Sequence, residues 1–584
     1  MTPRLQQLEE ELQGLARERG LDAGAVQVLA FLDDVIVATP PELACEVQEA
    51  AQRALGAAGL ELSPGKTQAW SARSARPDGV DERHWKAEGL TLVGVALGAE
   101  LPAGGLPDES DARRVDLGTA GFAEQRCGEV VLRATALLQR IAELPTLASP
   151  HLPAVQVSAL LLRLCGCGKV THLLRSSPPA STEAAAGVFD AALLEAYVKL
   201  AELDPLTDEQ AAQCRLPLRL GGRGLRSQQR LAPAAWAASW AQCLPEVLAR
   251  TGLDELEDLE VCQLPLAGAC RAALATLPPP TPDDDELPCW RELALMPCCK
   301  LQKSLSRRLD QKNYVDLLRS LDAEGKARLR SCGGPLSSAW QLATPARPSE
   351  RLEDEDYTLT ARALLGQARV PPDRPTCRRK RATGDRAGQL CGAALCVHHP
   401  YRCAVGGGTK QRSEAVEAAL ERIHTECGHH VARQVAVPAW DRFRWRCPGC
   451  GSRGLAFAPP VALCGDCGVA LETQREEAVL DLEVRGAAVP RQYLDVTVRH
   501  SVPGDAARLR SASGHDGAVN REAEVDKRSR YPDGRSPFRV LPIALESFGR
   551  FGRTALLHLR SLAKQQAQRL VEGGAEAVSS LVLC

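Results

Sequence analysis

The sequence predicts a multidomain protein of mixed α+β class that carries small zinc modules. Its 584 residues are more than one hydrophobic core usually organises, so several domains are expected. Strand-like patterns lie near both ends of the chain, whereas residues 101–250 carry apolar side chains at helical spacing. The 22 cysteines include close pairs, and in a long chain without an export signal such pairs indicate zinc rather than disulfides.

Charge and hydropathy narrow the class of protein. The net charge is −2, because acidic clusters at 254–260 and 283–286 offset arginine-rich stretches elsewhere. No apolar run approaches the roughly 20 residues that span a bilayer, and the first residues lack the core of a signal peptide. We therefore expect a soluble, intracellular protein without a membrane partner.

Two adjacent aspartates, Asp33 and Asp34, lie within VLAFLDDVIVAT at 28–39. The apolar, β-branched-rich runs on both sides predict two short strands that meet at the aspartates. Carboxylates at such a bend can bind a divalent metal through oxygen. For two residues alone, however, a solvated Asp-Asp turn is the commoner structure.

A lysine loop and a glycine-flanked apolar strand follow the hairpin. Residues 59–70 are GLELSPGKTQAW, with Lys66 in the loop, and residues 89–98 are GLTLVGVALG. Five residues separate Gly59 from Gly65, whereas a phosphate-binding P-loop has four at this point. The spacing therefore excludes a nucleotide triphosphatase of that type.

The order of these segments resembles the palm of reverse transcriptases, the RNA-directed DNA polymerase family. The resemblance implies that Asp33 and Asp34 hold catalytic metal and that Lys66 lies near the incoming nucleotide. The family places a further aspartate before this hairpin, where residues 1–29 predict only a charged helix. The resemblance thus implies a truncated palm at 1–100, followed by a helical thumb and connection at 101–276.

The middle of the sequence offers no candidate catalytic or metal-binding residues. THLLRSSPP and RLPLRLGGRGLRS, at 171–179 and 215–227, resemble the polymerase thumb and the region after it, although helical spacing alone indicates only a core. Cys165 and Cys167 are expected to be buried thiols rather than ligands. Proline and one-sign charge at 277–286 and 344–376 predict linkers or mobile loops around a helical segment.

A basic segment at 374–412 contains nine Lys or Arg residues and one acid, Asp385. Such an excess binds phosphate backbones without sequence preference, so DNA and RNA are the expected partners. Its densest run is the candidate nucleic-acid-binding surface: Arg378, Arg379, Lys380 and Arg381. Cys377, Cys391, Cys403 and a histidine, His398 or His399, can close a tetrahedral zinc site that orders this polar segment.

A second cysteine set has the spacing of a zinc ribbon. Two Cys-x-x-Cys pairs are separated by thirteen residues, and glycine lies in or directly after each knuckle. The four predicted zinc ligands are Cys447, Cys450, Cys464 and Cys467. ECGHH at 426–430 has no second pair and is expected to lie on the surface.

The C-terminal region combines strands, acids and a lysine. Residues 413–427 predict an amphipathic helix with Val416, Ala419, Leu420 and Ile423 on its apolar face. Two strand-like runs, 478–484 and 492–500, carry Asp481 and Asp495, and a helical run then places Lys527 and Tyr531 four residues apart. Carboxylates on adjacent strands can bind Mg²⁺. Taken singly, each of these residues is more often a solvated surface charge.

This order resembles the restriction-like endonuclease, of PD-(D/E)xK type, in one class of non-LTR (LINE-type) retrotransposon proteins. The resemblance implies that Asp481 and Asp495 are metal ligands and that Lys527 and Tyr531 are catalytic. Thr497 stands where the family has a lysine, so Lys527 would be its migrated substitute. The family also places histidine four residues before the last zinc cysteine, which favours His399 over His398 and leaves Cys377, at a long spacing, as the less certain ligand.

The predicted organisation places a linker and helical segment at 277–373, the basic zinc segment at 374–412, and a nuclease at 413–560 with a zinc ribbon inserted at 447–467. A C-terminal helix and tail would occupy 561–584. We expect a retrotransposon-derived nuclear protein, a polymerase remnant joined to a nuclease that nicks DNA, with Zn²⁺ and Mg²⁺ as cofactors. The alternative is a decayed element that binds nucleic acid through its zinc modules without catalysis.

Overall fold

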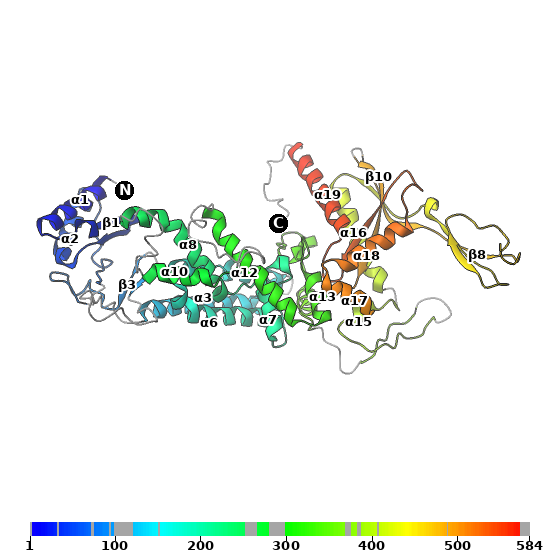
Figure 1. Cartoon of the computed structure of the whole chain (residues 1–584), viewed down its shortest axis with the longest axis horizontal. Coiled ribbons are helices and arrows are strands. Elements are labelled where there is room, and N and C mark those ends of the chain that lie inside the picture. The colour runs from blue at the N-terminus through cyan, green and yellow to red at the C-terminus, as the bar shows by residue number, and fades with distance from the viewer. Residues whose placement is uncertain are drawn as a thin grey trace. The chain divides into compact units, whose positions relative to one another are not determined.

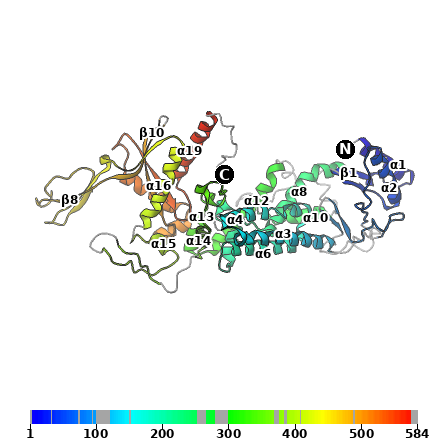
Figure 2. The same cartoon turned by 180° about the vertical axis from the view of Figure 1, so that it is seen from behind.

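Helices and several small sheets share the chain, which confirms the mixed α+β class. The computed structural model (Figures 1 and 2) describes residues 3–31, 34–71, 75–92, 95–98, 121–149, 152–251, 265–278, 298–367, 375–381, 387–405, 408–486 and 489–572. The chain divides into two compact units that do not follow chain order. Unit 1 comprises residues 1–140, 165–193 and 227–309, and unit 2 comprises residues 141–164, 194–226 and 310–584.

The N-terminal part of unit 1 is a small α+β cluster. Helix α1 (Pro3–Glu18) buries Leu5, Leu8 and Leu12 at helical spacing. These side chains pack with residues of the β1–β2 hairpin (Gln27–Phe31 and Asp34–Ala38) and of α2 (Ala44–Gly56). The hairpin pairs Phe31 with Asp34, so the chain reverses at the predicted position.

Residues 89–98 form a second hairpin rather than the single strand that was expected. Strand β3 (Gly89–Leu92) pairs antiparallel with β4 (Val95–Gly98), and Leu92 lies opposite Val95. Gly89 has a φ of 149°, and a Cβ there would lie 2.6 Å from the Leu97 carbonyl oxygen. Only glycine fits this close approach of the two strands. The composition of this apolar run, with glycine in its middle, is compatible with one strand or with two, so the sequence alone does not distinguish them.

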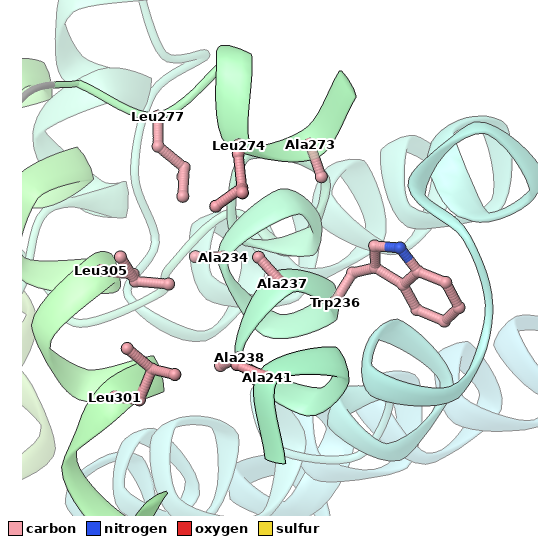
Figure 3. Packing of buried hydrophobic residues seen from close by; sticks show 10 residues of the cluster. All are labelled: Ala234, Trp236, Ala237, Ala238, Ala241, Ala273, Leu274, Leu277, Leu301 and Leu305. Atoms are coloured by element: carbon pink, nitrogen blue, oxygen red, sulfur yellow. The ribbon is translucent and has the colours of Figure 1, made fainter. Parts of the chain in front are cut away.

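The later residues of unit 1 that the structure describes are mostly helical. One of the unit's hydrophobic cores lies where α8 (Gln228–Thr251) packs against α10 (Pro265–Ala275) and the first part of α12 (Cys298–Ser320). Figure 3 shows the small side chains of Ala237 and Ala238 on α8, which face Leu274, Leu301 and Leu305. Alanine allows these helices to approach closely while the leucines fill the space between them. The other helices with residues in this unit are α3 (Phe122–Leu147), α5 (Thr171–Ser176) and α6 (Pro179–Leu200).

One stretch, Ala154–Ser176, departs from two expectations. In the part of the chain that the structure describes, it is long and apolar enough to cross a membrane, so the expectation that no such run exists is wrong. Leu160, Leu162 and Leu174 within it are nevertheless buried inside the protein. The cysteines at 165 and 167 are not the buried thiols that were expected, because Cys165 is exposed and Cys167 is half-buried after a π-helical turn, Leu162–Gly166.

Residues 344–367 were expected to be a linker but are packed into unit 2. Helix α14 (Asp354–Leu364) buries Tyr357, Ala361 and Leu364. Proline residues precede this helix, and three acids occupy its first turn. This composition is typical of a linker, but acids at the N-terminus of a helix interact favourably with its dipole. Nearby helices of the same unit are α4 (Ala154–Leu161), α7 (Asp208–Arg215) and α13 (Ala323–Cys332).

The C-terminal part of unit 2 contains a four-stranded sheet in the order β11-β10-β9-β5. Its strands are β5 (His430–Ala436), β9 (Val479–Gly486), β10 (Val489–Arg499) and β11 (Val540–Glu546), and β10 pairs antiparallel with β9 but parallel with β11. Leu482, Leu494 and Ile543 from three of these strands form a core with helices α16 (Gly408–Glu426) and α19 (Arg553–Glu572). Two further helices, α17 (Ala506–Gly514) and α18 (Ala518–Arg530), lie between β10 and β11 in the chain.

A three-stranded sheet is inserted between β5 and β9. It consists of β6 (Arg442–Arg446), β7 (Arg453–Ala456) and β8 (Glu472–Glu476), with β6 in the centre. In Figures 1 and 2 these strands (yellow, labelled β8) extend away from the four-stranded sheet. We call residues 442–476 the arm. It contains all four cysteines of the predicted zinc ribbon.

Candidate metal centres and carboxylate site

The basic segment brings together one complete set of metal ligands. Ligand atoms of Cys377, Cys391, His399 and Cys403 all lie within 4.8 Å of one another. The sulfur of Cys403 is 3.9 Å from that of Cys377 and 3.8 Å from that of Cys391. Tetrahedral zinc with Zn–S bonds of about 2.3 Å needs sulfurs roughly 3.8 Å apart. The set could hold a metal such as zinc, and it includes Cys377 despite that residue's long spacing.

The choice between the two histidines has a structural basis. His399 begins the short helix α15 (His399–Arg402), and its Nε2 lies 3.7 Å from Cys391 Sγ. His398 is instead buried within unit 2, where its Nδ1 lies 3.1 Å from His500 Nε2. Its other nitrogen, Nε2, lies 3.2 Å from a carboxylate oxygen of Glu324. His399 therefore belongs to the ligand set and His398 helps to fix the segment.

The second ligand set lies at the outer end of the arm. Cys447, Cys450, Cys464 and Cys467 meet the same 4.8 Å criterion, with sulfur-to-sulfur distances of 3.3 Å for Cys447–Cys467 and 3.6 Å for Cys450–Cys464. Glycines with φ of 76° and 70° follow the two knuckles, at 451 and 468. A hydrogen bond with the Ser452 hydroxyl lowers the pKa of Cys450 to about 6, which favours the thiolate that zinc requires at this position. A hydrogen bond from the Val469 backbone lowers the pKa of Cys467, but hydrogen bonds with the neighbouring thiols outweigh it and raise that pKa to about 12.

Asp481 and Asp495 lie where strands β9 and β10 separate. The ladder between the strands ends at Leu482 opposite Leu494, so one further step would place the two aspartates opposite each other. Instead of continuing the ladder, Asp481 Oδ2 accepts a hydrogen bond of 2.6 Å from the Val496 backbone N–H. Burial, together with the nearby Asp495 carboxylate, raises the pKa of Asp481 to about 6.

Lys527 reaches this pair from helix α18. Its Nζ lies 2.7 Å from Asp495 Oδ2, and the lysine side chain is 26% exposed while that of the aspartate is 5% exposed. Tyr531 follows the last turn of the helix, and its ring packs edge-on against Trp440 at 6.0 Å. Burial raises the pKa of Tyr531 to about 12, and Asp495 adds to the shift, so the phenol stays protonated near the carboxylates.

Sequence reasoning missed Glu417 and Gln434. Glu417 lies on α16 and is 2% exposed, in a helix face where only apolar residues were expected. Gln434 of β5 donates to Glu417 Oε2 at 3.2 Å and approaches Asp481 Oδ1 at 3.5 Å. Its φ of 52° is uncommon for a residue other than glycine, and such backbone strain clusters at functional sites. The available signal in the sequence was that Glu417 lies three residues before Leu420, and therefore close to the apolar face of the predicted helix.

The acids are not gathered as tightly as the thiols. Among the residues that the structure describes, only the two cysteine-containing sets bring three or more ligand atoms within 4.8 Å of one another. Gln434 instead joins Glu417 to Asp481, and the backbone N–H of Val496, the residue after Asp495, donates to Asp481. The arrangement can bind a cation through carboxylate oxygens if the side chains close around it.

The predicted polymerase residues that the structure describes are not brought together into a site. Asp33 lies outside the described residues, Asp34 is exposed at the start of β2, and Lys66 is exposed in a turn. Within the described part, no hydrogen bond or ion pair joins Asp34 to Lys66. The four basic residues at 378–381 are all exposed, so their charges are accessible to a partner.

The expectation that ECGHH lies on the surface holds for Glu426, Gly428 and His430, which are exposed, but not for the other two residues. Cys427 is buried, and His429 belongs to a chain of three imidazoles. His424 Nδ1 lies 2.9 Å from His429 Nδ1, and His424 Nε2 lies 3.0 Å from His558 Nε2 of α19. Helix α16 continues through Glu426, which turns His424 and Cys427 inward. His424 and His558 lie on helices that are distant in the sequence, so no local pattern could predict their contact.

This histidine chain predicts a loss of stability in acid. Burial lowers the pKa of His424 to about 3 and that of His558 to about 4, whereas unfolded histidine titrates near 6.5. Because folded-state pKa values are lowered, stability is complete above pH 6.5 and falls as the pH drops toward 4. At pH 5.5 each such histidine costs about 1.4 kcal/mol. Hydrogen exchange of α19 amides at pH 7.5 and 5.5 measures the change.

The control for this prediction uses two single variants. His558→Gln removes one of the titrating groups and should reduce the pH dependence, whereas His515→Gln changes an exposed histidine and should leave it intact. An identical pH dependence in wild type and His558→Gln would show that the chain is not the source.

Comparison with protein-family models gives no match, and comparison with curated proteins gives none either, so the functional assignment depends on the residues and their geometry.

Proposed function

We propose that the C-terminal part of unit 2 is a metal-dependent endonuclease that nicks DNA. The observation that carries the proposal is the ion pair between Lys527 and the buried Asp495, beside a second carboxylate whose pKa is raised. Three groups from two strands and a helix converge there, and perturbed carboxylates next to a lysine are typical of functional sites. The resemblance to restriction-like endonucleases of non-LTR retrotransposons supports the same assignment.

The chemistry of the donor set fits Mg²⁺, because Asp481, Asp495 and Glu417 offer only oxygen ligands. Asp481 and Asp495 would hold the ion, with Glu417 at the edge of the site. Bound Mg²⁺ would polarise the phosphate and lower the pKa of the attacking water. Burial raises the pKa of Asp481 most and repulsion from Asp495 adds to it, and the charge of a dication would relieve that repulsion.

The protein's own residues have separate roles in this proposal. Lys527 holds Asp495 in place. Its positive charge would also stabilise the negative charge that develops on the phosphate oxygens during cleavage. The Val496 N–H and the Gln434 amide orient the two oxygens of Asp481. Tyr531, protonated and packed on Trp440, can donate a hydrogen bond to a phosphate oxygen.

The origin of the chain is part of the same proposal. We infer a retrotransposon-derived protein in which residues 1–100 are a reverse transcriptase remnant, with Asp33, Asp34 and Lys66 as its polymerase residues and Mg²⁺ as its metal. The β1–β2 hairpin, in which Phe31 pairs with Asp34, supports the inference. DNA and RNA would be the partners and the nucleus the site of action.

A second candidate function is non-catalytic nucleic-acid binding. It is favoured by the two complete ligand sets and by the exposed residues Arg378, Arg379, Lys380 and Arg381 beside one of them. Incubation of supercoiled plasmid with the full chain and Mg²⁺ separates the two functions. Nicked product that disappears with EDTA supports the nuclease, whereas binding without any nicking supports the alternative.

The pH profile of nicking provides a further prediction. Metal binding needs the ionised carboxylate, and the pKa of Asp481 is raised to about 6. We expect kcat/KM for nicking to fall about tenfold per pH unit below pH 6 and to level off above it. The same raised pKa means that the ionised group destabilises the metal-free fold above pH 6, so Asp481→Asn should unfold at higher denaturant concentration at pH 7. Flat activity between pH 5 and 7 would contradict the assignment.

A further inference from the structure

The arginines of the arm fall into two groups. Arg442 and Arg444 both pair with Glu476, at 3.4 Å and 2.5 Å, and Arg475 pairs with Asp441 at 2.5 Å. All three guanidinium groups are held in ion pairs within the protein, and Arg442 and Arg444 share one carboxylate. Their ion pairs lie along β6 and β8, close to the base of the arm.

Arg446 and Arg453 are different. They are exposed and lie directly opposite each other on β6 and β7. Among the described residues, no carboxylate lies within ion-pair distance of either guanidinium. Strand β8 places Glu472 opposite Arg446 in register, but the two side chains do not form an ion pair. Like charges that face each other across a sheet are destabilising. An external anion would remove this repulsion.

A third exposed arginine extends the surface. Arg535, in the loop between α18 and β11, lies with its guanidinium 4.0 Å from the centre of the Phe457 ring, at the end of β7. Leu455, the neighbour of Arg453 along the same face, is 48% exposed. Stacked arginine and exposed apolar side chains beside free guanidinium groups are features of nucleic-acid-binding surfaces.

The arm begins beside the carboxylate site. Strand β8 ends at Glu476, and Asp481 follows five residues later on β9. Trp440, two residues before β6, packs on Tyr531. From Arg442 to Arg446 the strand covers about 13 Å, which is roughly four phosphate steps along one DNA strand. Duplex that enters the site would therefore lie within reach of the outer arginines.

We propose that Arg446, Arg453 and Arg535 bind the phosphate backbone of DNA several base pairs from the phosphate that is cut. This surface is distinct from the basic run at 378–381, and the inference rests on the proposed nuclease for the position of the cut. The zinc ribbon then has a mechanical role, because it holds the tips of β6 and β7 and keeps the two arginines side by side.

The test compares two double variants with equal charge change. Arg446→Gln/Arg453→Gln removes the free arginines. Arg444→Gln/Arg485→Gln removes two exposed, paired ones, and their acids Glu476 and Glu483 each keep a second arginine, Arg442 and Arg491. Binding of a 30-base-pair duplex without Mg²⁺ is measured between 50 and 300 mM salt. The slope of log K against log salt is negative, and we expect it to become less steep by about 1.8 in the first variant, about 0.9 for each phosphate that is no longer neutralised, and to stay unchanged in the second.

The outcomes are distinguishable. Equal slope changes in both variants would mean that only net charge matters, and they would overturn the inference. Loss of zinc from Arg446→Gln/Arg453→Gln alone would mean that these arginines balance the nearby thiolates, which also overturns it. A slope change without any Mg²⁺-dependent nicking by wild type would support the surface while the proposed nuclease fails. Nicking with unchanged slopes would do the reverse.

Discussion

Asp495→Asn is expected to abolish Mg²⁺-dependent nicking while DNA binding persists. Asparagine has nearly the same volume, but it cannot offer an anionic ligand or an ion pair to Lys527. Loss of the metal ligand should lower the nicking rate by on the order of a thousandfold, because metal stabilisation of the charged transition state is lost. Binding depends on exposed arginines and lysines and should change less than threefold, or about 0.7 kcal/mol.

A nearby acid supplies the matched control. Asp526 lies on the same helix as Lys527, is 51% exposed and pairs with Arg499. Asp526→Asn removes the same charge close to the site, yet it should nick plasmid at nearly the wild-type rate. Equal loss in both variants would assign the effect to local electrostatics, and wild-type nicking by Asp495→Asn would refute the proposed site. Hydrogen exchange of β9 and β10 checks that both variants are folded.

The predictable features of this protein are those encoded over short stretches of sequence. The period-two alternation around Asp481 and Asp495 placed both strands, and the helical run placed Lys527 on the element that follows. The Cys-x-x-Cys pairs likewise predicted a ligand set that the fold brings within 4.8 Å. In each case the spacing of residue types is itself the physical requirement.

The missed features depend on interactions between distant segments. Glutamate at position 417 of an amphipathic helix would be expected to face solvent, but Glu417 is buried beside β5, where Arg433 and Gln434 both contact its carboxylate. His424 becomes part of an imidazole chain only because α19 brings His558 beside it. Periodicity predicts which helix face is inward, but it does not predict that polar partners lie there.

Substitution of one arm cysteine has the other large expected effect. The arm lacks a hydrophobic core of its own, since Val461 is 81% exposed and Leu463 is 56% exposed. Zinc binding contributes about 10 to 16 kcal/mol in small zinc modules, far more than the few backbone hydrogen bonds of the two knuckles. Cys464→Ser should therefore lose one of two bound zinc ions per chain and leave residues 442–476 without protection from hydrogen exchange.

The rest of unit 2 should tolerate this loss. The four-stranded sheet has a separate core around Leu482 and Leu494, so protection of β9 and β10 should persist. Cys396→Ser changes an exposed cysteine outside both ligand sets and should keep two zinc ions and full arm protection. Elemental analysis and exchange mass spectrometry measure both properties on the same samples. An arm that stays protected after Cys464→Ser with zinc lost would mean that strand pairing, and not the metal, holds β6, β7 and β8 together.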